Sequence, residues 1–482
     1  MLCLQISMLK NKHSLTEGPI IKSLLTLALP IIIANVFQAA YQLTDSFWVG
    51  RLGEKAVASV AISSPIIFLL TSLGIGFAVA GSTLTAQYFG AKKEKMVNHS
   101  AAQTLLMVGS VSLLLSLIGL IFAPQILKII GAPADIYATA LSYMRVVFIG
   151  LLPNFCFFMF QSIMRSIGKP ALPVYIVIGT VILNFILDPL FMFGWGFIPR
   201  LEVSGVAFAT LITQTLAAVI GFAILFSGKR GIHLKLKDLI PDKKFISRSF
   251  FLGLPASIEQ SARSLGMVVM TSLIAGFGTL AVASYGAASN IIQLIIIVSI
   301  GLSASTATLA GQNIGAGNID RAERIVSLSM RISFIGLSIA GLMTYFFAPA
   351  LIAFFVPNDP AIIAGGAAFL RILAFSFGLI GIQMSVNAIM QASGNTLTSM
   401  IITLTSQWAL QLPLAFVLSR YTPLGISGLW YAFPATNILI ALIAFLTFKT
   451  GKWKKKRLTA NDKLASEISE NIQTEELVPY DA

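Results

Sequence analysis

The sequence is poor in charged residues, in cysteine and in histidine. Only 11% of its 482 residues are charged, whereas soluble domains carry roughly 25%. The two cysteines, Cys3 and Cys156, supply neither a disulfide framework nor a metal-binding spacing. The three histidines stand in polar segments. These shortages exclude an ordinary soluble domain, a disulfide-stapled scaffold and a histidine–metal centre within the apolar segments.

Short catalytic motifs are missing as well. The chain contains no G-x-x-x-x-G-K-[ST], no H-E-x-x-H and no G-x-S-x-G sequence. Binding of ATP within this chain and the common hydrolytic reactions therefore lack the residues that carry them. We expect a protein that is not an enzyme and that needs no cofactor other than a coupling ion.

Apolar residues dominate what is present. Hydrophobic residues make up 56% of the chain, and the mean hydropathy is +0.86. Because a membrane-spanning helix needs about 20 predominantly apolar residues, the sequence predicts an all-α polytopic membrane protein with twelve transmembrane helices. The predicted spans are 26–50, 57–81, 100–123, 137–160, 171–194, 204–227, 249–275, 280–305, 326–348, 361–386, 396–419 and 426–448.

The positive charge of the chain is unevenly distributed. Of 33 Lys and Arg residues, 24 lie in the termini and in the alternate loops on the same side of the predicted bundle. Since basic loops stay on the cytoplasmic side, both termini are predicted in the cytoplasm and the protein in the plasma (inner) membrane. Membrane topology explains the net charge of +14 better than a nucleic-acid surface does. The expected partners are therefore the lipid bilayer and small molecules, without nucleic acid, and the expected state is a monomer.

The two halves of the chain repeat each other. "GEKAVAS" (53–59) matches "GTLAVAS" (278–284), and "TLTAQYFGA" (83–91) matches "TLAGQNIGA" (308–316), each at an offset of 225 residues. Six helices per copy give both copies the same orientation, so they form parallel repeats in two pseudo-symmetric six-helix lobes. Two facing lobes create a central cleft, which favours a secondary transporter. The expected divisions are a cytoplasmic N-terminus 1–22, an N-lobe 23–228, a cytoplasmic linker 229–248, a C-lobe 249–449 and a basic, then acidic, tail 450–482.

With this repeat, "QAAYQLTDSFWVGRLG", "AQYFGA" and "AGQNIGAG" resemble the multidrug and toxic compound extrusion (MATE) family over residues 18–450. The resemblance implies export of cationic or amphipathic compounds in antiport with H⁺ or Na⁺, by alternating access. Acidic residues in the first and fifth helices resemble the DinF-like branch. The alternative is a flippase for lipid-linked precursors from the same wider superfamily. That function would call for more cationic residues in the cleft.

The first predicted helix carries a polar stripe. At 100° per residue, Asn35, Gln38, Tyr41, Gln42 and Asp45 fall within an arc of about 120°. A carboxylate at the centre of a membrane helix costs roughly 2.5–3.5 kcal/mol on insertion scales, so Asp45 requires a functional or structural reason. We expect Asp45 to couple an ion and the other four residues to contact substrate.

A second acid lies in the fifth predicted helix. Asp188 follows Asn184 by four residues, so the two side chains share a face, and Pro189 is expected to kink the helix. In the repeat, Met270 corresponds to Asp45 and Leu412 to Asp188. Because a requirement of the shared fold would place acids in both lobes, the asymmetry favours an ion site in the N-lobe over structural hydrogen bonds.

The same residues suit either coupling ion. Carboxylate and amide oxygens of Asp45, Asn184 and Asp188 could ligate Na⁺, and a buried carboxyl pair could instead carry H⁺. By resemblance, Asn154 in the fourth helix and Thr210 in the sixth extend this ion-coupling site.

In the second half, Glu259 and Arg263 form an i, i+4 pair near one end of the seventh predicted helix. The sequence favours neither of two roles for this pair, a structural one in which the two charges neutralise each other and a functional one. Three amide side chains of the second half add polar points to the cleft and are further substrate-contact candidates: Gln383, Asn387 and Gln407.

Overall fold

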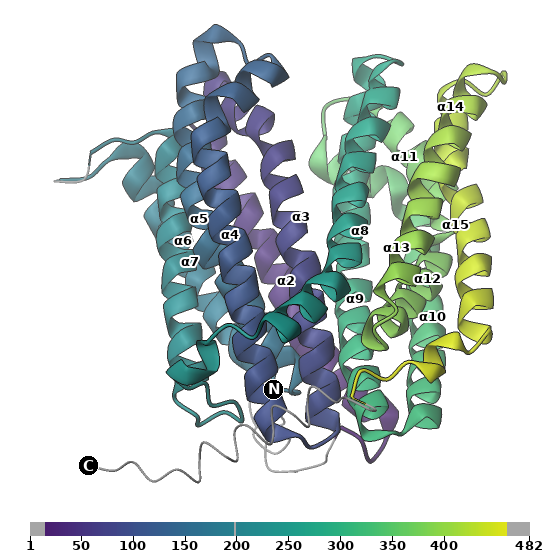
Figure 1. Ribbon diagram of the computed structural model, residues 1–482. Coiled ribbons are helices and arrows are strands. Elements are labelled where there is room, and N and C mark those ends of the chain that lie inside the picture. The colour runs from purple at the N-terminus through teal and green to yellow at the C-terminus, as the bar shows by residue number, and fades with distance from the viewer. Residues whose placement is uncertain (1–14, 197–198, 460–482) are drawn as a thin grey trace, which may run out of the picture.

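The computed structural model describes residues 15–196 and 199–459. Their helices form two bundles that stand side by side (Figure 1). The predicted N-terminal segment before residue 15 and the acidic part of the tail after residue 459 lie outside the described residues. The fold is the predicted one, an all-α membrane protein of twelve transmembrane helices in two six-helix lobes.

The N-lobe contains six helices that match the predicted spans and extend most of them. They are α2 (Ile20–Gly50), α3 (Glu54–Gly90), α4 (Glu94–Ile130), α5 (Ala134–Ser166), α6 (Ala171–Phe193) and α7 (Val203–Phe226). The 3₁₀ turn η1 (Leu236–Leu239) lies in the predicted linker. Pro189 lies inside α6, which continues to Phe193.

The C-lobe repeats this arrangement with two interruptions. Its helices are α8 (Lys243–Ala275), α9 (Thr279–Ala316), α10 (Ile319–Phe355), α11 (Pro360–Ala374), α12 (Phe377–Ala392), α13 (Thr396–Leu404), the π-helical segment η2 (Thr405–Gln411), α14 (Leu412–Arg420) and α15 (Ile426–Lys449). The predicted span 361–386 is two helices, α11 and α12, bent by 57° at their junction. The predicted span 396–419 is α13, η2 and α14 in series.

Hydropathy alone recovers fewer spans than the fold contains. By length and composition, ten helices in the described ranges could cross a membrane, or eleven with the bent pair α11–α12 as one span. Helix α8 is not among them, because it carries charged residues along its length, including Lys243, Arg248, Glu259 and Arg263. It also begins at Lys243, six residues before the predicted start at 249.

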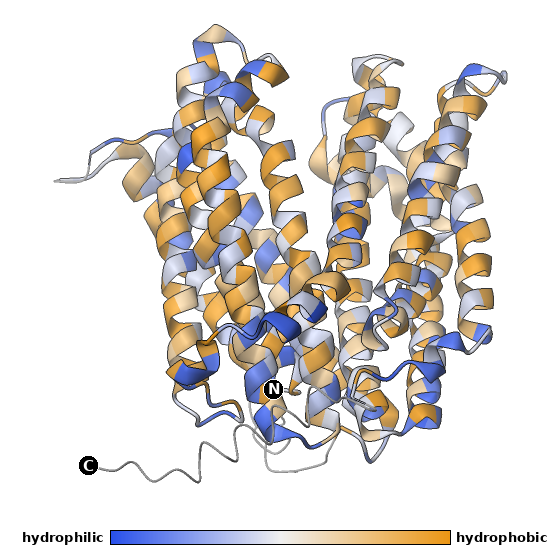
Figure 2. Ribbon diagram, viewed as in Figure 1, coloured by the Kyte–Doolittle hydropathy of each residue, from blue (hydrophilic) through white to orange (hydrophobic). Residues whose placement is uncertain are grey.

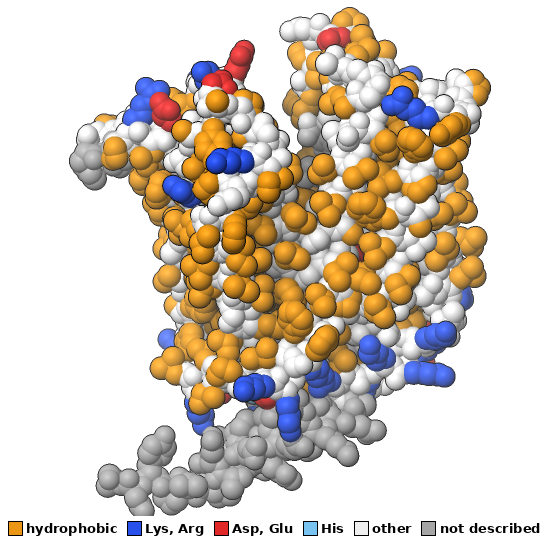
Figure 3. All heavy atoms as spheres, turned by 45° about the horizontal axis from the view of Figure 1, so that its top comes forward, with side chains coloured by type: hydrophobic (Ala, Val, Ile, Leu, Met, Phe, Trp, Pro, Cys, Tyr) orange, Lys and Arg blue, Asp and Glu red, His pale blue; other side chains and the backbone are white. Residues whose placement is uncertain are grey.

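One end of the bundle is basic. Lys and Arg side chains gather there, in residues 91–95, 165–169, 228–248, 321–324 and 452–457; we call it the basic end. Figure 2 shows hydrophilic residues there and hydrophobic ones along the middle of the helices. At the opposite end a cleft separates the two lobes (Figure 3).

The first helix of each lobe crosses over to the other lobe. Leu24 and Leu27 of α2 are buried against Leu302 and Leu309 of α9. In the same way, Phe245 of α8 is buried in the large core of the N-lobe. This reciprocal packing joins the lobes.

The start of the predicted tail is packed rather than free. After α15 the chain forms a 3₁₀ turn, η3 (Lys452–Lys455), in which Trp453 is only 1% exposed and stacks on Phe448. The Leu458 N–H then donates to Gln87 Oε1 at 2.8 Å, so this segment reaches the N-lobe.

Candidate ion-coupling site and the contacts between the lobes

Helices α2, α6 and α7 meet around the two acids of the N-lobe. Asp45 lies five residues before the end of α2, and Asp188 lies five residues before the end of α6. Thr210 lies seven residues after the start of α7. All three helix ends belong to the side of the bundle opposite the basic end (Figure 1). The site therefore lies toward the ends of α2 and α6 that are away from the basic end.

The predicted residues are joined by hydrogen bonds. Asn184 Nδ2 donates to Asp188 Oδ1 at 3.0 Å, and Thr210 Oγ1 donates to Asp45 Oδ2 at 3.4 Å. Asp45 and Asp188 approach each other where α2 packs against α6. Tyr41 OH lies 2.7 Å from Thr213 Oγ1 of α7. The structure thus brings Asp45, Asn184, Asp188 and Thr210 together, as the sequence predicts.

This cluster leaves three buried oxygens without a partner in the described part of the chain. They are Asp45 Oδ1, Asp188 Oδ2 and Asn184 Oδ1, and both Asn184 and Asp188 are 0% exposed. A buried acceptor without a hydrogen bond costs about 1–3 kcal/mol, so unsatisfied groups call for an explanation such as an ion. A cation held here would supply such a partner, either as a proton shared by the carboxyl groups or as a Na⁺ ligated by oxygen.

The other predicted N-lobe residues take different positions. Tyr41 is buried and bonded to α7, whereas Gln38 and Gln42 are exposed. Asn35 is half-buried and its Nδ2 has no partner within the described ranges. Asn154 on α5 is half-buried and, among the described residues, makes no hydrogen bond with the acid pair. The polar stripe of α2 therefore divides between the interior of the lobe and its surface.

The C-lobe acid has a different environment. Glu259 is 2% exposed and lies midway along α8, not near a helix end as the sequence suggested. Ser399 Oγ donates to its Oε2 at 2.8 Å, and Thr403 Oγ1 donates to its Oε1 at 3.0 Å. Arg263 Nη2 lies 3.5 Å from Oε1. The predicted Glu259–Arg263 pair is present, within a shell of hydroxyl donors.

Two of the predicted C-lobe amides belong to this shell. Asn387 is buried and donates to Thr403 at 3.3 Å, and Gln407 donates to the backbone oxygen of Arg263 at 3.4 Å. Gln383 is half-buried on α12. Asn387 therefore supports Thr403 on α13 and Gln407 supports α8, and their contact with substrate stays a prediction.

Sequence reasoning missed Ser399 and Thr403. Their i, i+4 spacing places both hydroxyls on one face of α13. That spacing is the only signal in the sequence, since nothing local indicates that the face meets α8.

Sequence reasoning also missed a pair of contacts that fasten the lobes near the basic end. Gln87 Nε2 of α3 donates to the carbonyl oxygen of Ala392 at 2.7 Å, and Gln312 Nε2 of α9 donates to that of Ser166 at 2.7 Å. Gln87 and Gln312 are repeat partners at the offset of 225. We call this reciprocal pair the glutamine latch.

Two glycines allow the latch to close. A Cβ atom at Gly90 would collide with the backbone of Gln312, and one at Gly315 would collide with the backbone of Gln87. These glycines belong to the motifs "AQYFGA" and "AGQNIGAG". The repeat motif therefore supplies glycine where the backbones of α3 and α9, one from each lobe, approach each other closely.

Comparisons with known proteins agree with this architecture. The family model described as MatE matches residues 30–190 and 255–417, one segment in each lobe. The probable multidrug resistance protein YoeA of Bacillus subtilis (strain 168) is 28% identical over 442 residues, which cover 91% of this chain and 95% of that protein. The FAD transporter of Shewanella oneidensis is 28% identical over 441 residues, with 91% and 96% covered. Among solved structures, the crystal structure of MATE in complex with MaL6 has a TM-score of 0.86 at 25% identity, covering 92% of this chain and 98% of that one.

Proposed function

Because the chain belongs to the MatE family of multidrug transporters, we propose that it exports cationic or amphipathic compounds in antiport with H⁺ or Na⁺, coupled through Asp45 and Asp188. The observation that carries this proposal is the set of three buried, unpartnered oxygens on Asp45, Asn184 and Asp188. Such a set is costly unless a cation occupies it. An ion that binds there and leaves again supplies the coupling that an antiporter requires.

The proposed orientation follows from charge. The basic end faces the cytoplasm of the plasma membrane, because Lys and Arg accumulate on that side. The cleft between the lobes then opens to the outside, and the glutamine latch closes the inner side. In this state the acid pair, near the outer ends of α2 and α6, receives its cation from outside.

Export requires the cation and the substrate to favour different states of the protein. Binding of a cation neutralises the Asp45–Asp188 pair and changes the contacts among α2, α6 and α7, which weakens the hold on a cationic substrate. For the cleft to open inward, the contacts of Gln87 and Gln312 must break. The two events occur at opposite ends of the N-lobe, so the helices of that lobe transmit the change.

The test is transport in proteoliposomes with an imposed gradient. Efflux of ethidium or norfloxacin is measured under a pH gradient and then under a Na⁺ gradient. Wild-type protein is expected to respond to one of them, whereas Asp45→Asn and Asp188→Asn abolish the response and leave folding intact. Asp135→Asn is the matched control, because Asp135 is an exposed acid of the same lobe.

Two results would overturn the assignment. Gradient-driven transport at the wild-type rate in both site variants would contradict a coupling role for the acid pair. Driven movement of an anionic compound, without movement of ethidium or norfloxacin, would overturn the cationic substrate class. FAD is included as the anionic probe because one relative is named as an FAD transporter.

A further inference from the structure

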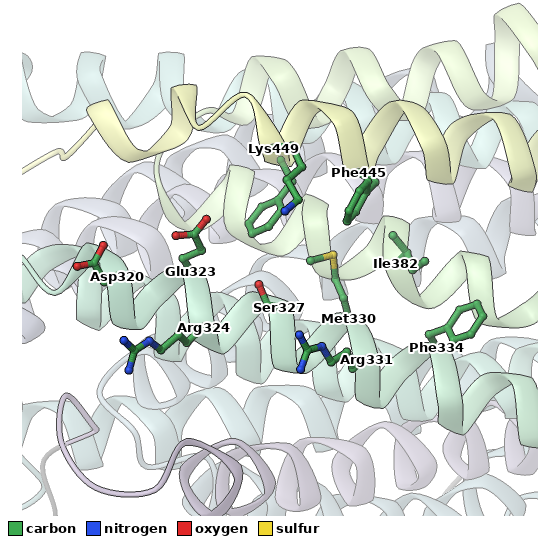
Figure 4. Close-up of a pocket in the computed structure, with 11 residues that line it drawn as sticks. Asp320, Glu323, Arg324, Ser327, Met330, Arg331, Phe334, Ile382, Phe445 and Lys449 are labelled. Atoms are coloured by element: carbon green, nitrogen blue, oxygen red, sulfur yellow. The ribbon is translucent and has the colours of Figure 1, made fainter.

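A cavity lies far from the acid pair, in the C-lobe near the basic end. It has a volume of about 780 Å³ and is formed by α10, α12 and α15 (Figure 4). Its lining combines charged residues toward the start of α10 with apolar residues farther along that helix. Neither Asp45 nor Glu259 contributes to it.

The charges of this cavity favour an anion. Arg324, Ser327 and Arg331 follow one face of α10, and Lys449 at the end of α15 stands across from them (Figure 4). Of the two lining acids, Glu323 is already paired with Lys454 at 2.7 Å, and Asp320 lies in the first turn of α10. Neither Arg324 nor Arg331 has a carboxylate partner among the residues that the structure describes. Three cations therefore face the cavity against the carboxylate of Asp320, which leaves an excess of positive charge.

The remaining wall is apolar. Met330 and Phe448 are buried in this wall, and Phe334, Ile382 and Phe445 complete it. Phe334 and Phe445 are 42% and 40% exposed, so they present rings that the rest of the protein does not cover. Burial against this apolar wall stabilises a bound acyl chain, whereas a free inorganic anion has no apolar surface to bury.

The depth of the cavity matches the boundary between lipid headgroups and hydrocarbon. Helix α10 has 37 residues and is thus about 55 Å long, roughly 25 Å longer than the hydrocarbon core. With the helix centred in the bilayer, Arg324 lies just outside the hydrocarbon and Arg331 just inside it. An arginine at that depth is costly unless an anion accompanies it.

We propose that this cavity binds one anionic phospholipid of the inner leaflet. The lipid phosphate lies among Arg324, Arg331 and Lys449, with the Ser327 hydroxyl available as a further donor, and an acyl chain follows Phe334, Ile382 and Phe445. Basic pockets between helices on the cytoplasmic side are the sites that lipid headgroups use. The inner-leaflet assignment rests on the proposed orientation, whereas lipid binding itself does not depend on transport.

The experiment measures lipid binding to the purified full-length protein by native mass spectrometry. Phosphatidylglycerol and phosphatidylcholine are added separately, and inorganic phosphate is added as a competitor. Phosphatidylglycerol is expected to bind the wild type more tightly than phosphatidylcholine. With about 1 kcal/mol for each basic residue near the surface, the variant R324Q/R331Q/K449Q loses affinity on the order of 100-fold.

Two further variants test whether the effect is specific to this cavity. K229Q/K237Q/K243Q removes three exposed lysines of the basic end outside the cavity and is expected to bind as the wild type does. Ile382→Trp fills the cavity and leaves every charge in place, so it should weaken binding even if the triple variant folds poorly. Thermal midpoints of all variants report folding.

Several outcomes contradict the proposal. Equal binding of phosphatidylglycerol and phosphatidylcholine would show that the cavity does not select an anionic lipid. Wild-type binding by both R324Q/R331Q/K449Q and Ile382→Trp would show that the lipid binds elsewhere. Displacement of phosphatidylglycerol by inorganic phosphate would show that the cavity recognises phosphate alone and not a lipid. The acidic residues after Thr459 are a competing anion within the chain. If phosphatidylglycerol binds to a chain that ends at Thr459 but does not bind to the full-length chain, the tail is the occupant of the cavity.

Discussion

The two lobes fill corresponding positions with opposite chemistry. In the N-lobe, Asp45 and Asp188 lie close to each other, and each has one carboxylate oxygen without a hydrogen-bond partner among the described residues. Their repeat partners in the C-lobe, Met270 and Leu412, are 2% and 7% exposed and belong to one apolar core cluster. The same helix arrangement therefore folds with either pair. The acids are not a requirement of the fold, and their presence in one lobe points to a task that this lobe performs alone.

The acid of the C-lobe completes the contrast. Glu259 accepts from two hydroxyl groups and lies beside Arg263, whereas Asp45 and Asp188 each keep one oxygen without a partner in the part of the chain that the structure describes. A carboxylate whose acceptors are satisfied stabilises packing, and one with free acceptors has room for an ion. Hydrogen-bond satisfaction, more than burial, separates the two kinds of intramembrane acid in this chain.

The largest expected effect comes from giving the N-lobe the residues of the C-lobe. D45M/D188L should abolish cation-driven transport in proteoliposomes. Its thermal midpoint should stay equal or rise, because the variant removes buried acceptors that each cost about 1–3 kcal/mol. The matched control is M270L/L412M, a volume-conserving exchange in the C-lobe that should preserve transport. A strong loss of stability in D45M/D188L would mean that the acid pair holds the N-lobe together.

The reverse exchange tests the C-lobe core. Met270→Asp buries a carboxylate among apolar neighbours such as Ile274 and Leu412. An uncompensated buried charge costs about 3–5 kcal/mol, so the thermal midpoint in detergent should fall sharply. Met270→Leu serves as the control, with an expected cost below about 1.5 kcal/mol. A Met270→Asp protein as stable as the wild type would show that the C-lobe also accommodates an ion site.

Much of this contrast could be predicted from the sequence. Twelve helices and two lobes follow from apolar runs and from the 225-residue repeat, and the resemblance to MATE is confirmed by the family match. The branch within the family stays a prediction. The Asp45–Asp188 neighbourhood could be predicted because intramembrane acids are rare and the repeat showed which copy carries them.

The rest depends on contacts between distant segments. The bend between α11 and α12 has no proline at its junction, whereas the π-helical turn Thr405–Gln411 does carry a local signal, since Pro413 just after it cannot donate a backbone hydrogen bond back into the turn. Ser399 meets Glu259 across 140 residues, and Gln87 meets Ala392 across 305. Short polar side chains carry no mark of such partners, so only the assembled bundle identifies them.

A smaller effect is expected at Glu259. Glu259→Gln replaces one acceptor oxygen by an NH₂ group, so one of the hydroxyls of Ser399 and Thr403 can no longer donate to it, and stability should fall by about 1–3 kcal/mol. Transport per folded molecule should keep its response to the pH or Na⁺ gradient. Ser399→Ala, which removes one donor, is the control and should cost about 1 kcal/mol. Wild-type stability combined with lost coupling would place Glu259 in the ion site and erase the contrast between the lobes.

The smallest effect concerns the one feature that the lobes share symmetrically, the glutamine latch. Q87A/Q312A removes both hydrogen bonds of the latch and also the bond from Leu458 N–H to Gln87, worth about 0.5–1.5 kcal/mol each. The population with an open basic end should therefore rise several-fold. Spin labels at positions 93 and 318, in a protein whose two cysteines are replaced, report the distance between the lobes. Gln103→Ala is the matched control, because Gln103 is an equally buried glutamine whose bonds to Asp238, Ile240 and Asp242 stay on the N-lobe side. An equal shift in that control would attribute the effect to general loosening, whereas a shift confined to Q87A/Q312A assigns closure of the basic end to the latch.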